Sequence, residues 1–189
     1  MLRTLGDRAN RGGSRRLAIT ALLGAGLAQP ALAAKVGGVV PVSRQFEVRL
    51  LAAHNQERSA LKLPPMTWDP KLAAAARRWA AYLAGTHALV HSTSDPSDPD
   101  PDGENLWGGT SGFYSPEDMV GMWTRERSDF KPDRFPNNSR SGRGELGHYT
   151  QVVWRATTRI GCGVASDGED DFLVCRYKEA GNVLGERPY

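Results

Sequence analysis

Two polar side chains in apolar surroundings are the residues of this sequence best suited to chemistry, and the first is His148. It lies in the stretch 147–154, where an imidazole, an aromatic ring and two hydrogen-bonding side chains stand directly against an apolar run. An imidazole changes charge near neutral pH and is a common metal ligand, although a histidine beside a tyrosine can equally be a packing residue. The stretch therefore indicates either a site joined to a core element or a buried, hydrogen-bonded histidine.

The second is Glu126, which interrupts an apolar stripe at helical spacing. The stripe consists of Met119, Met122, Trp123 and Phe130. Glu126 occupies the remaining position of that face, where a hydrophobic residue is expected. A buried carboxylate must be hydrogen-bonded, paired or metal-bound, because its desolvation is otherwise costly. The alternative is a side chain that reaches solvent from the edge of the stripe.

Three helices are predicted to hold these residues and the core around them. The first runs from Ser43 to about Leu61 and stops before Pro64-Pro65. The second begins with Asp69 as N-cap and Pro70 at the first helical position, and one of its faces is rich in alanine. The third is announced by 115–118, Ser-Pro-Glu-Asp, which resembles a capping box.

The C-terminal third contains a predicted β-hairpin that carries both cysteines. Two apolar segments, 160–164 and 172–177, flank a polar turn, and a turn centred on Gly168-Glu169 sets Cys162 opposite Cys175. In an oxidising compartment this predicts a disulfide that stabilises the fold by about 3 kcal/mol. Two free thiols, or a metal site that uses cysteine, are the alternatives.

The first 33 residues are predicted to direct export of the protein and not to belong to the folded domain. Five arginines precede an apolar run from Leu17 to Ala28, and Ala31-Leu32-Ala33 is an A-x-A cleavage site, so 1–33 is a predicted bacterial signal peptide. The segment 14–19 also resembles a twin-arginine signal, and the Sec and twin-arginine routes both stay open. We expect a linker over 34–42, one domain over 43–189, and a secreted or periplasmic location.

Charge and hydropathy exclude two classes of partner. Five of the 24 basic and one of the 21 acidic residues lie in 1–33, so 19 basic and 20 acidic residues remain. This balance gives no basic surface for nucleic acid, and no later stretch is apolar enough to span a membrane. The run 95–102 contains four Asp residues, which could suggest calcium, but its interleaved prolines favour a solvated loop.

Four sequence blocks, in this order and spacing, resemble the CAP superfamily of cysteine-rich secretory proteins, venom antigen five and plant pathogenesis-related class one proteins. The blocks are 54–58 (HNQER), 102–107 (DGENLW), 147–154 (GHYTQVVW) and the C-terminal 172–189. The resemblance covers about 43–189 and implies an α+β fold, a three-layer α-β-α sandwich with a small, mainly antiparallel central sheet. It also implies a short helix over 149–154, where β-branched residues by themselves predict a strand.

The resemblance further implies a cleft lined by two histidines and two glutamates. Matched motif by motif, these are His91, Glu104, Glu126 and His148. Such a set is competent for zinc or another divalent cation, with the histidines as ligands and the glutamates orienting their rings, and it is equally able to hold itself together without a metal. His54 lies outside these motifs and is predicted to pack or to cap. This chain has two cysteines where many eukaryotic members form three disulfides.

The sequence indicates the family of this protein more clearly than its function, because a shared fold does not determine an activity. We expect a binding module for a lipid, sterol or peptide rather than an enzyme. A hydrolase that uses the His/Glu set is the first alternative, with Ser92 or Thr150 as the candidate nucleophile; a purely structural or interaction domain is the second. The sequence contains no Gly-x-Ser-x-Gly elbow and no His-Glu-x-x-His pair.

Overall fold

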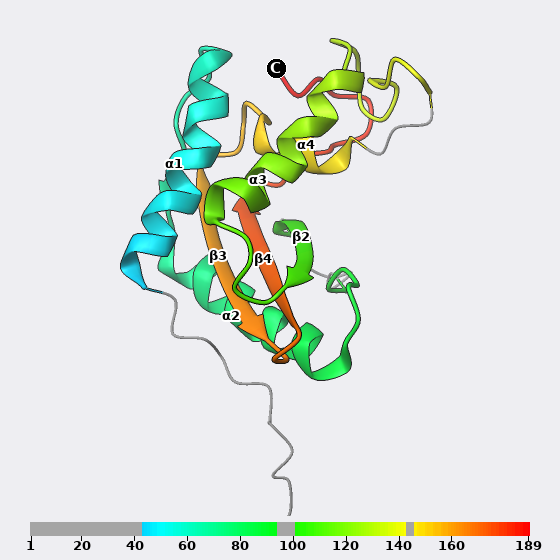
Figure 1. Cartoon of the computed structure of the whole chain (residues 1–189). Coiled ribbons are helices and arrows are strands. Elements are labelled where there is room, and N and C mark those ends of the chain that lie inside the picture. The colour runs from blue at the N-terminus through cyan, green and yellow to red at the C-terminus, as the bar shows by residue number, and fades with distance from the viewer. Residues whose placement is uncertain (1–42, 94–100, 143–145) are drawn as a thin grey trace, which may run out of the picture. The chain divides into compact units, whose positions relative to one another are not determined.

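The computed structural model describes residues 43–93, 101–142 and 146–189. The predicted signal peptide, the predicted linker and most of the acidic run lie outside the described residues. The elements follow in the order α1 (Arg44–Ala60), β1 (Thr67–Trp68), α2 (Pro70–Thr86), β2 (Gly103–Thr110), α3 (Pro116–Thr124), the 3₁₀ helix η1 (Arg125–Asp129), α4 (Gly147–Val152), β3 (Arg159–Ser166) and β4 (Asp170–Lys178) (Figure 1). In the part of the chain that is described, no helix is long and apolar enough to cross a membrane.

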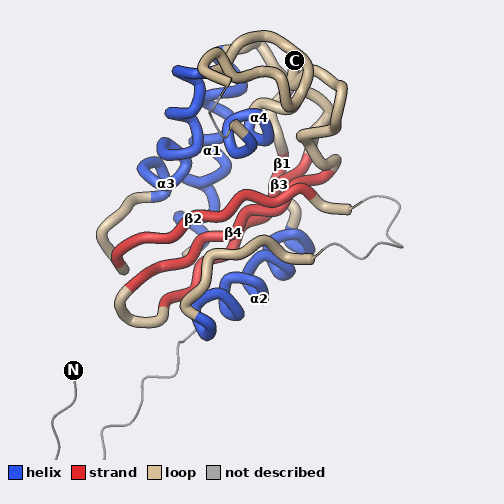
Figure 2. The backbone as a smooth tube through the Cα atoms, turned by 90° about the vertical axis from the view of Figure 1, so that its right-hand side faces the viewer, coloured by secondary structure: helices blue, strands red, loops and turns tan. Residues whose placement is uncertain are grey.

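The strands form one sheet in the order β1-β3-β4-β2. The pairing of β1 with β3 is parallel, and the other two pairings are antiparallel. Figure 2 shows α2 against one face of the sheet and α1, α3 and α4 on the other. This confirms the predicted α+β class and the three-layer α-β-α arrangement with a mainly antiparallel sheet.

The helix starts follow the capping residues of the sequence. The Ser43 hydroxyl accepts a hydrogen bond from the backbone N–H of Phe46, and the Asp69 carboxylate accepts two from the first turn of α2. At α3, Ser115 and Asp118 form the reciprocal capping box. Each of these side chains satisfies backbone N–H groups that have no partner inside the helix.

Close approach of α2 to β3 depends on two glycines. A Cβ added at Gly161 would lie 2.2 Å from the backbone nitrogen of Ala73, and one added at Gly163 would lie 2.4 Å from that of Arg77. Alanines on α2 complete this close contact, and they pack with Leu106, Ala165, Phe172 and Val174 of the sheet. Any larger residue at these glycines would push the helix off the sheet.

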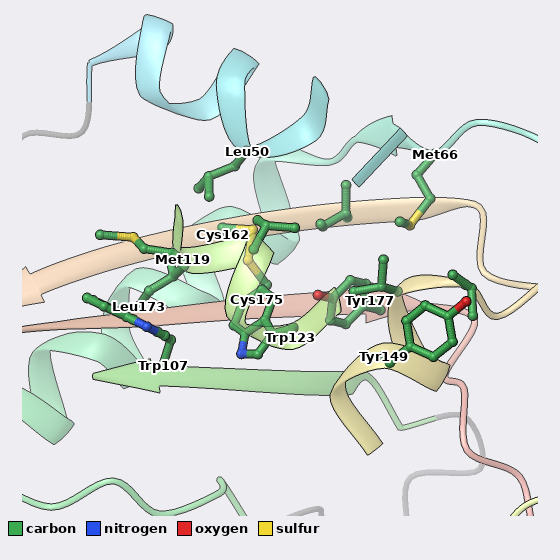
Figure 3. Packing of buried hydrophobic residues seen from close by; sticks show 14 of the residues in the cluster. Leu50, Met66, Trp107, Met119, Trp123, Tyr149, Cys162, Leu173, Cys175 and Tyr177 are labelled. Atoms are coloured by element: carbon green, nitrogen blue, oxygen red, sulfur yellow. A yellow bond between two sulfur atoms is a disulfide. The ribbon is translucent and has the colours of Figure 1, made fainter. Parts of the chain in front are cut away.

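The larger core lies between the other face of the sheet and α1, α3 and α4. Cys162 and Cys175 are direct partners across the β3–β4 ladder, and they form a disulfide inside this core (Figure 3). The hairpin turn contains Gly168 at a positive φ of 99°, as a tight turn requires. The predicted register and the predicted disulfide are both confirmed.

Because both sulfurs are buried and paired, the native protein should resist thiol alkylation. We expect the intact mass to be unchanged after incubation with iodoacetamide, whereas a sample first reduced in denaturant should gain two labels. Two labels on native, unreduced protein would contradict the pairing.

The structure decides two local predictions, of which the first is wrong and the second is confirmed. The third helix does not continue to Phe130, because α3 ends at Thr124 and the chain tightens into η1, so Glu126 lies on a 3₁₀ turn. The segment that β-propensity favours as a strand forms helix α4, as the resemblance implied. Tertiary hydrogen bonds, described below, outweigh the local preference there.

Candidate functional site

His148 and Glu126 form the first of two histidine–glutamate pairs. The Nδ1 atom of His148 lies 2.6 Å from Oε1 of Glu126, and the backbone N–H of Tyr149 donates to Oε2 of the same carboxylate at 2.9 Å. The Glu126 side chain is 20% exposed and that of His148 is 33% exposed. Glu126 is therefore half-buried and fully engaged, and the interpretation that it merely extends to solvent is wrong.

His91 and Glu104 form the second pair with the same pattern. The Nδ1 atom of His91 lies 3.0 Å from Oε1 of Glu104, and the backbone N–H of Ser92, the next residue, donates to that oxygen at 2.9 Å. The second carboxylate oxygen accepts from the Ser92 hydroxyl at 2.8 Å and from Arg176 at 3.3 Å. Only 8% of the Glu104 side chain is exposed, against 63% for His91.

This shared pattern fixes the tautomer of each neutral histidine. A carboxylate only accepts hydrogen bonds, so the proton of the neutral ring lies on Nδ1 in both pairs. The lone pair is then on Nε2, which is the arrangement seen where a carboxylate orients a metal-binding histidine. Each pair can thus present one imidazole nitrogen as a ligand or a hydrogen-bond acceptor.

The two pairs flank the free edge strand β2 from opposite faces. Side chains alternate along a strand, so Glu104 shares a face with Leu106, which packs in the α2 cluster. Asn105 points to the other face, where its Nδ2 donates to the backbone carbonyl of His148 at 3.1 Å. This hydrogen bond ties α4 to the strand immediately beside Glu104.

The structure brings His91 together with Glu104 and His148 together with Glu126. Among residues 43–93, 101–142 and 146–189, no three His, Cys, Asp or Glu side chains form a group that could hold a metal ion. Convergence of the two imidazoles on one ion remains a prediction.

The two hydroxyls named as candidate nucleophiles are both engaged. Thr150 is fully buried, and its hydroxyl donates back to the carbonyl of Leu146 at 2.8 Å, within its own helix. The Ser92 hydroxyl donates to Glu104 and accepts from Arg176 at 3.0 Å. Its complete burial disfavours Thr150 as the nucleophile of the hydrolase hypothesis.

Arg176 is a site residue that the sequence reasoning missed. It pairs with Glu104 across the β2–β4 ladder, and its guanidinium supports the Glu104 carboxylate and the Ser92 hydroxyl. Asp102, at the end of the acidic run, lies 3.4 Å from the Lys178 amine. The sequence did contain a signal for Arg176. Side chains alternate along a strand, so a charged residue between Cys175 and Tyr177 is expected on the opposite face of the sheet from these two.

Arg58 and the C-terminal segment hold α4 in place. The Arg58 side chain donates to the carbonyls of Val152 at 3.1 Å and Trp154 at 2.7 Å, at the end of that helix. At its start, the Asn182 amide donates to the carbonyl of Gly147 at 2.9 Å. The Arg58 bonds satisfy carbonyls at the C-terminal end of α4, which have no partner inside the helix, and the Asn182 bond holds the first residue of α4 to the C-terminal segment. Together they explain why the segment is helical.

Fold and site together define a class: a small α-β-α domain whose edge strand is flanked by two histidine–carboxylate pairs. Comparison with known proteins agrees with this class. The family model described as the cysteine-rich secretory protein family, CAP, matches residues 51–177. The chain is 43% identical over 139 residues to a pathogenesis-related protein of PR-1 type from Sambucus nigra, covering 72% of this chain and 78% of the relative.

Further relatives and solved structures point the same way. Pathogenesis-related protein 1 of Arabidopsis thaliana is 40% identical over 141 residues, covering 74% of this chain and 80% of the relative. The fold matches a crystal structure of NaASP2 with Zn²⁺ at a TM-score of 0.65 and 22% identity, covering 80% and 90% of the two chains. It also matches venom allergen-like protein 4 of Schistosoma mansoni at 0.60 and 22% identity, covering 78% and 95%. The chain therefore belongs to the CAP family.

Proposed function

We propose that this chain is an exported CAP-domain binding module whose two histidine–glutamate pairs present imidazole nitrogens to a divalent cation, zinc by preference. The observation that carries the proposal is the repeated clamp, in which a glutamate binds Nδ1 of a histidine and the next backbone N–H. The same clamp built twice beside one strand favours orientation of the rings over simple packing. A crystal structure of similar fold, that of NaASP2 with Zn²⁺, adds support.

In this proposal the ion is weakly held. His91 and His148 would supply two nitrogen ligands, Glu104 and Glu126 would keep the rings in the Nδ1–H tautomer, and water would complete the coordination. A bound ion would act as a Lewis acid or as a bridge to a ligand donor. The domain would be secreted or periplasmic, since its disulfide suits an oxidising compartment.

The organic ligand in this proposal is a lipid, sterol or peptide. A hollow of about 190 Å³ beside α1, lined partly by Val48, Leu51 and Trp68, offers apolar surface for such a molecule. Lipid extraction of the purified protein followed by mass spectrometry tests this part. A hydrolase that uses the same four residues is the alternative, and turnover lost in Glu126→Gln with no bound ligand would favour it.

Zinc titration by calorimetry tests the metal part directly. We expect His148→Ala and His91→Ala each to abolish measurable Zn²⁺ binding, and Glu126→Gln to weaken it by about 10- to 100-fold, because the ring loses its orienting carboxylate. His87→Ala is the matched control, since His87 also pairs through Nδ1 with a carboxylate, that of Asp167 at 2.8 Å, on the surface. Equal loss in the His87 variant would mean that the ion binds elsewhere.

A further inference from the structure

A directional chain of buried hydrogen bonds runs from α1 to His148. Nδ1 of His54 lies 2.8 Å from the carbonyl of Leu50, which only accepts, so the neutral ring carries its proton on Nδ1. Its Nε2 then accepts from the Tyr177 hydroxyl at 2.9 Å. Asn105 lies diagonally from Tyr177 across the β2–β4 ladder, on the same face of the sheet, where its side chain acts on the Tyr177 hydroxyl, and its amide donates to the His148 carbonyl.

The donor and acceptor roles along this chain are mutually compatible. Tyr177 donates once to His54 and can accept from Asn105, whose two amide hydrogens can serve Tyr177 and the His148 carbonyl. All three side chains are at most 1% exposed. A buried polar network that is fully satisfied holds one geometry, because any rotation leaves a buried group without a partner.

An aromatic contact connects the same two histidines by a second route. The Trp123 ring is stacked on His148, with centroids 6.2 Å apart and an interplanar angle of 11°, and it makes an edge contact with His54 at 5.9 Å. Its indole N–H donates to the carbonyl of Leu106 at 2.9 Å, which fixes the ring on β2. Trp123 and Tyr177 are both labelled within the core in Figure 3.

We propose that His54, Tyr177 and Asn105 are positioning residues that fix His148 for ligand binding, so the affinity of the site is set in part by the core of the domain. The inference rests on the proposed function of His148 as a metal ligand. His148 needs this support because α4 has six residues and no side-chain cap at its start, and so short a helix has little stability of its own. Asn105 fixes its backbone, Trp123 supports one ring face, and Glu126 fixes Nδ1.

The test uses Tyr177→Phe, which removes one hydroxyl and keeps the ring, with Val164→Ala on β3 as a control that loosens the same core without touching the chain. Two properties are measured: the affinity for Zn²⁺, and the ring tautomer of His148 without metal by ¹⁵N NMR. We expect Tyr177→Phe to weaken Zn²⁺ binding about tenfold and to lower the population of the Nδ1–H tautomer, because a less firmly held His148 ring loses part of its hydrogen bond to Glu126. Val164→Ala should change neither property.

The two proposals fail in different ways. If the wild-type protein binds no Zn²⁺, the metal function fails, and the tautomer of His148 alone decides the positioning role. If Zn²⁺ binds through His148 but Tyr177→Phe changes neither affinity nor tautomer, the positioning role is overturned and the metal function stands. Equal losses in Val164→Ala would also overturn it. Should Tyr177→Phe fail to fold, His54→Gln, which still has a donor and an acceptor, replaces it and should lose less affinity than His54→Leu.

Discussion

Replacement of Arg58 by methionine should remove most of the stability of the domain. The Arg58 side chain is fully buried and donates to four carbonyls, those of Pro64, Val152, Trp154 and Thr157, at 2.7–3.1 Å. Burial lowers the pKa of Arg58 to about 10, so the guanidinium is still charged at neutral pH. Each carbonyl left without a donor costs about 1–3 kcal/mol, so we expect a loss of at least about 4 kcal/mol.

Urea unfolding of Arg58→Met, Arg58→Lys and Arg155→Met measures this effect. The lysine variant should be intermediate, because an ammonium group cannot reach all the carbonyls that the planar fork serves. Arg155 is exposed, and its positive charge repels that of Arg58. Arg155→Met should therefore change the free energy of unfolding by less than about 0.5 kcal/mol. A stable Arg58→Met protein would show that water can replace the guanidinium.

The helix starts and the hairpin could be predicted from the sequence because local chemistry determines them. Ser43, Asp69 and Ser115 cap helices through their own side chains, within three residues of chain. The register that pairs Cys162 with Cys175 follows from the turn between them. No distant part of the molecule is needed for either prediction.

The end of α3 and the helical state of α4 depend on distant groups. Glu126 leaves the predicted helix face because the chain tightens into η1, where the carboxylate binds His148 and the N–H of Tyr149. The α4 segment has β-forming residues, yet Arg58 satisfies a carbonyl at its C-terminal end and Asn182 holds its first residue in place. Periodicity and propensity contain no information on such partners.

The members of the candidate site came from the resemblance, and their arrangement came from the structure. Two of them also had an independent signal: Glu126 as a carboxylate in an apolar stripe, and His148 as an imidazole beside an apolar run. The buried face of α1 consists of Leu50, His54 and Arg58, at a spacing of four residues that marks one helix face. The predicted packing role of His54 is confirmed, since this residue is fully buried. Burial of Arg58 could not be predicted with its partners unknown, because a buried arginine is rare unless it is paired.

Acidification should destabilise the domain through His54. Burial lowers the pKa of this imidazole from 6.5 to about 4, and the nearby charge of Arg58 acts in the same direction. Between these two values the unfolded chain binds a proton and the folded chain does not, so the free energy of unfolding falls as the pH falls. The contribution is complete above pH 6.5 and is lost on the way to pH 4, by about 3 kcal/mol. A second proton on the ring would also place an N–H at Nε2, where it would face the hydroxyl hydrogen that Tyr177 donates to this atom.

Urea unfolding of the wild type and His54→Gln at pH 7.0, 5.5 and 4.5 isolates this contribution. Glutamine does not titrate, and the partly buried carboxylates whose pKa values are lowered, such as those of Asp69 and Asp129, are common to both proteins. Their effect therefore cancels in the difference. The stability advantage of the wild type should shrink steadily from pH 7.0 to 4.5, because only its buried imidazole resists the proton that the unfolded chain accepts. A difference that stays constant over this range would mean that the folded protein protonates His54 readily, and the buried chain from Leu50 to His148 would then be open to water.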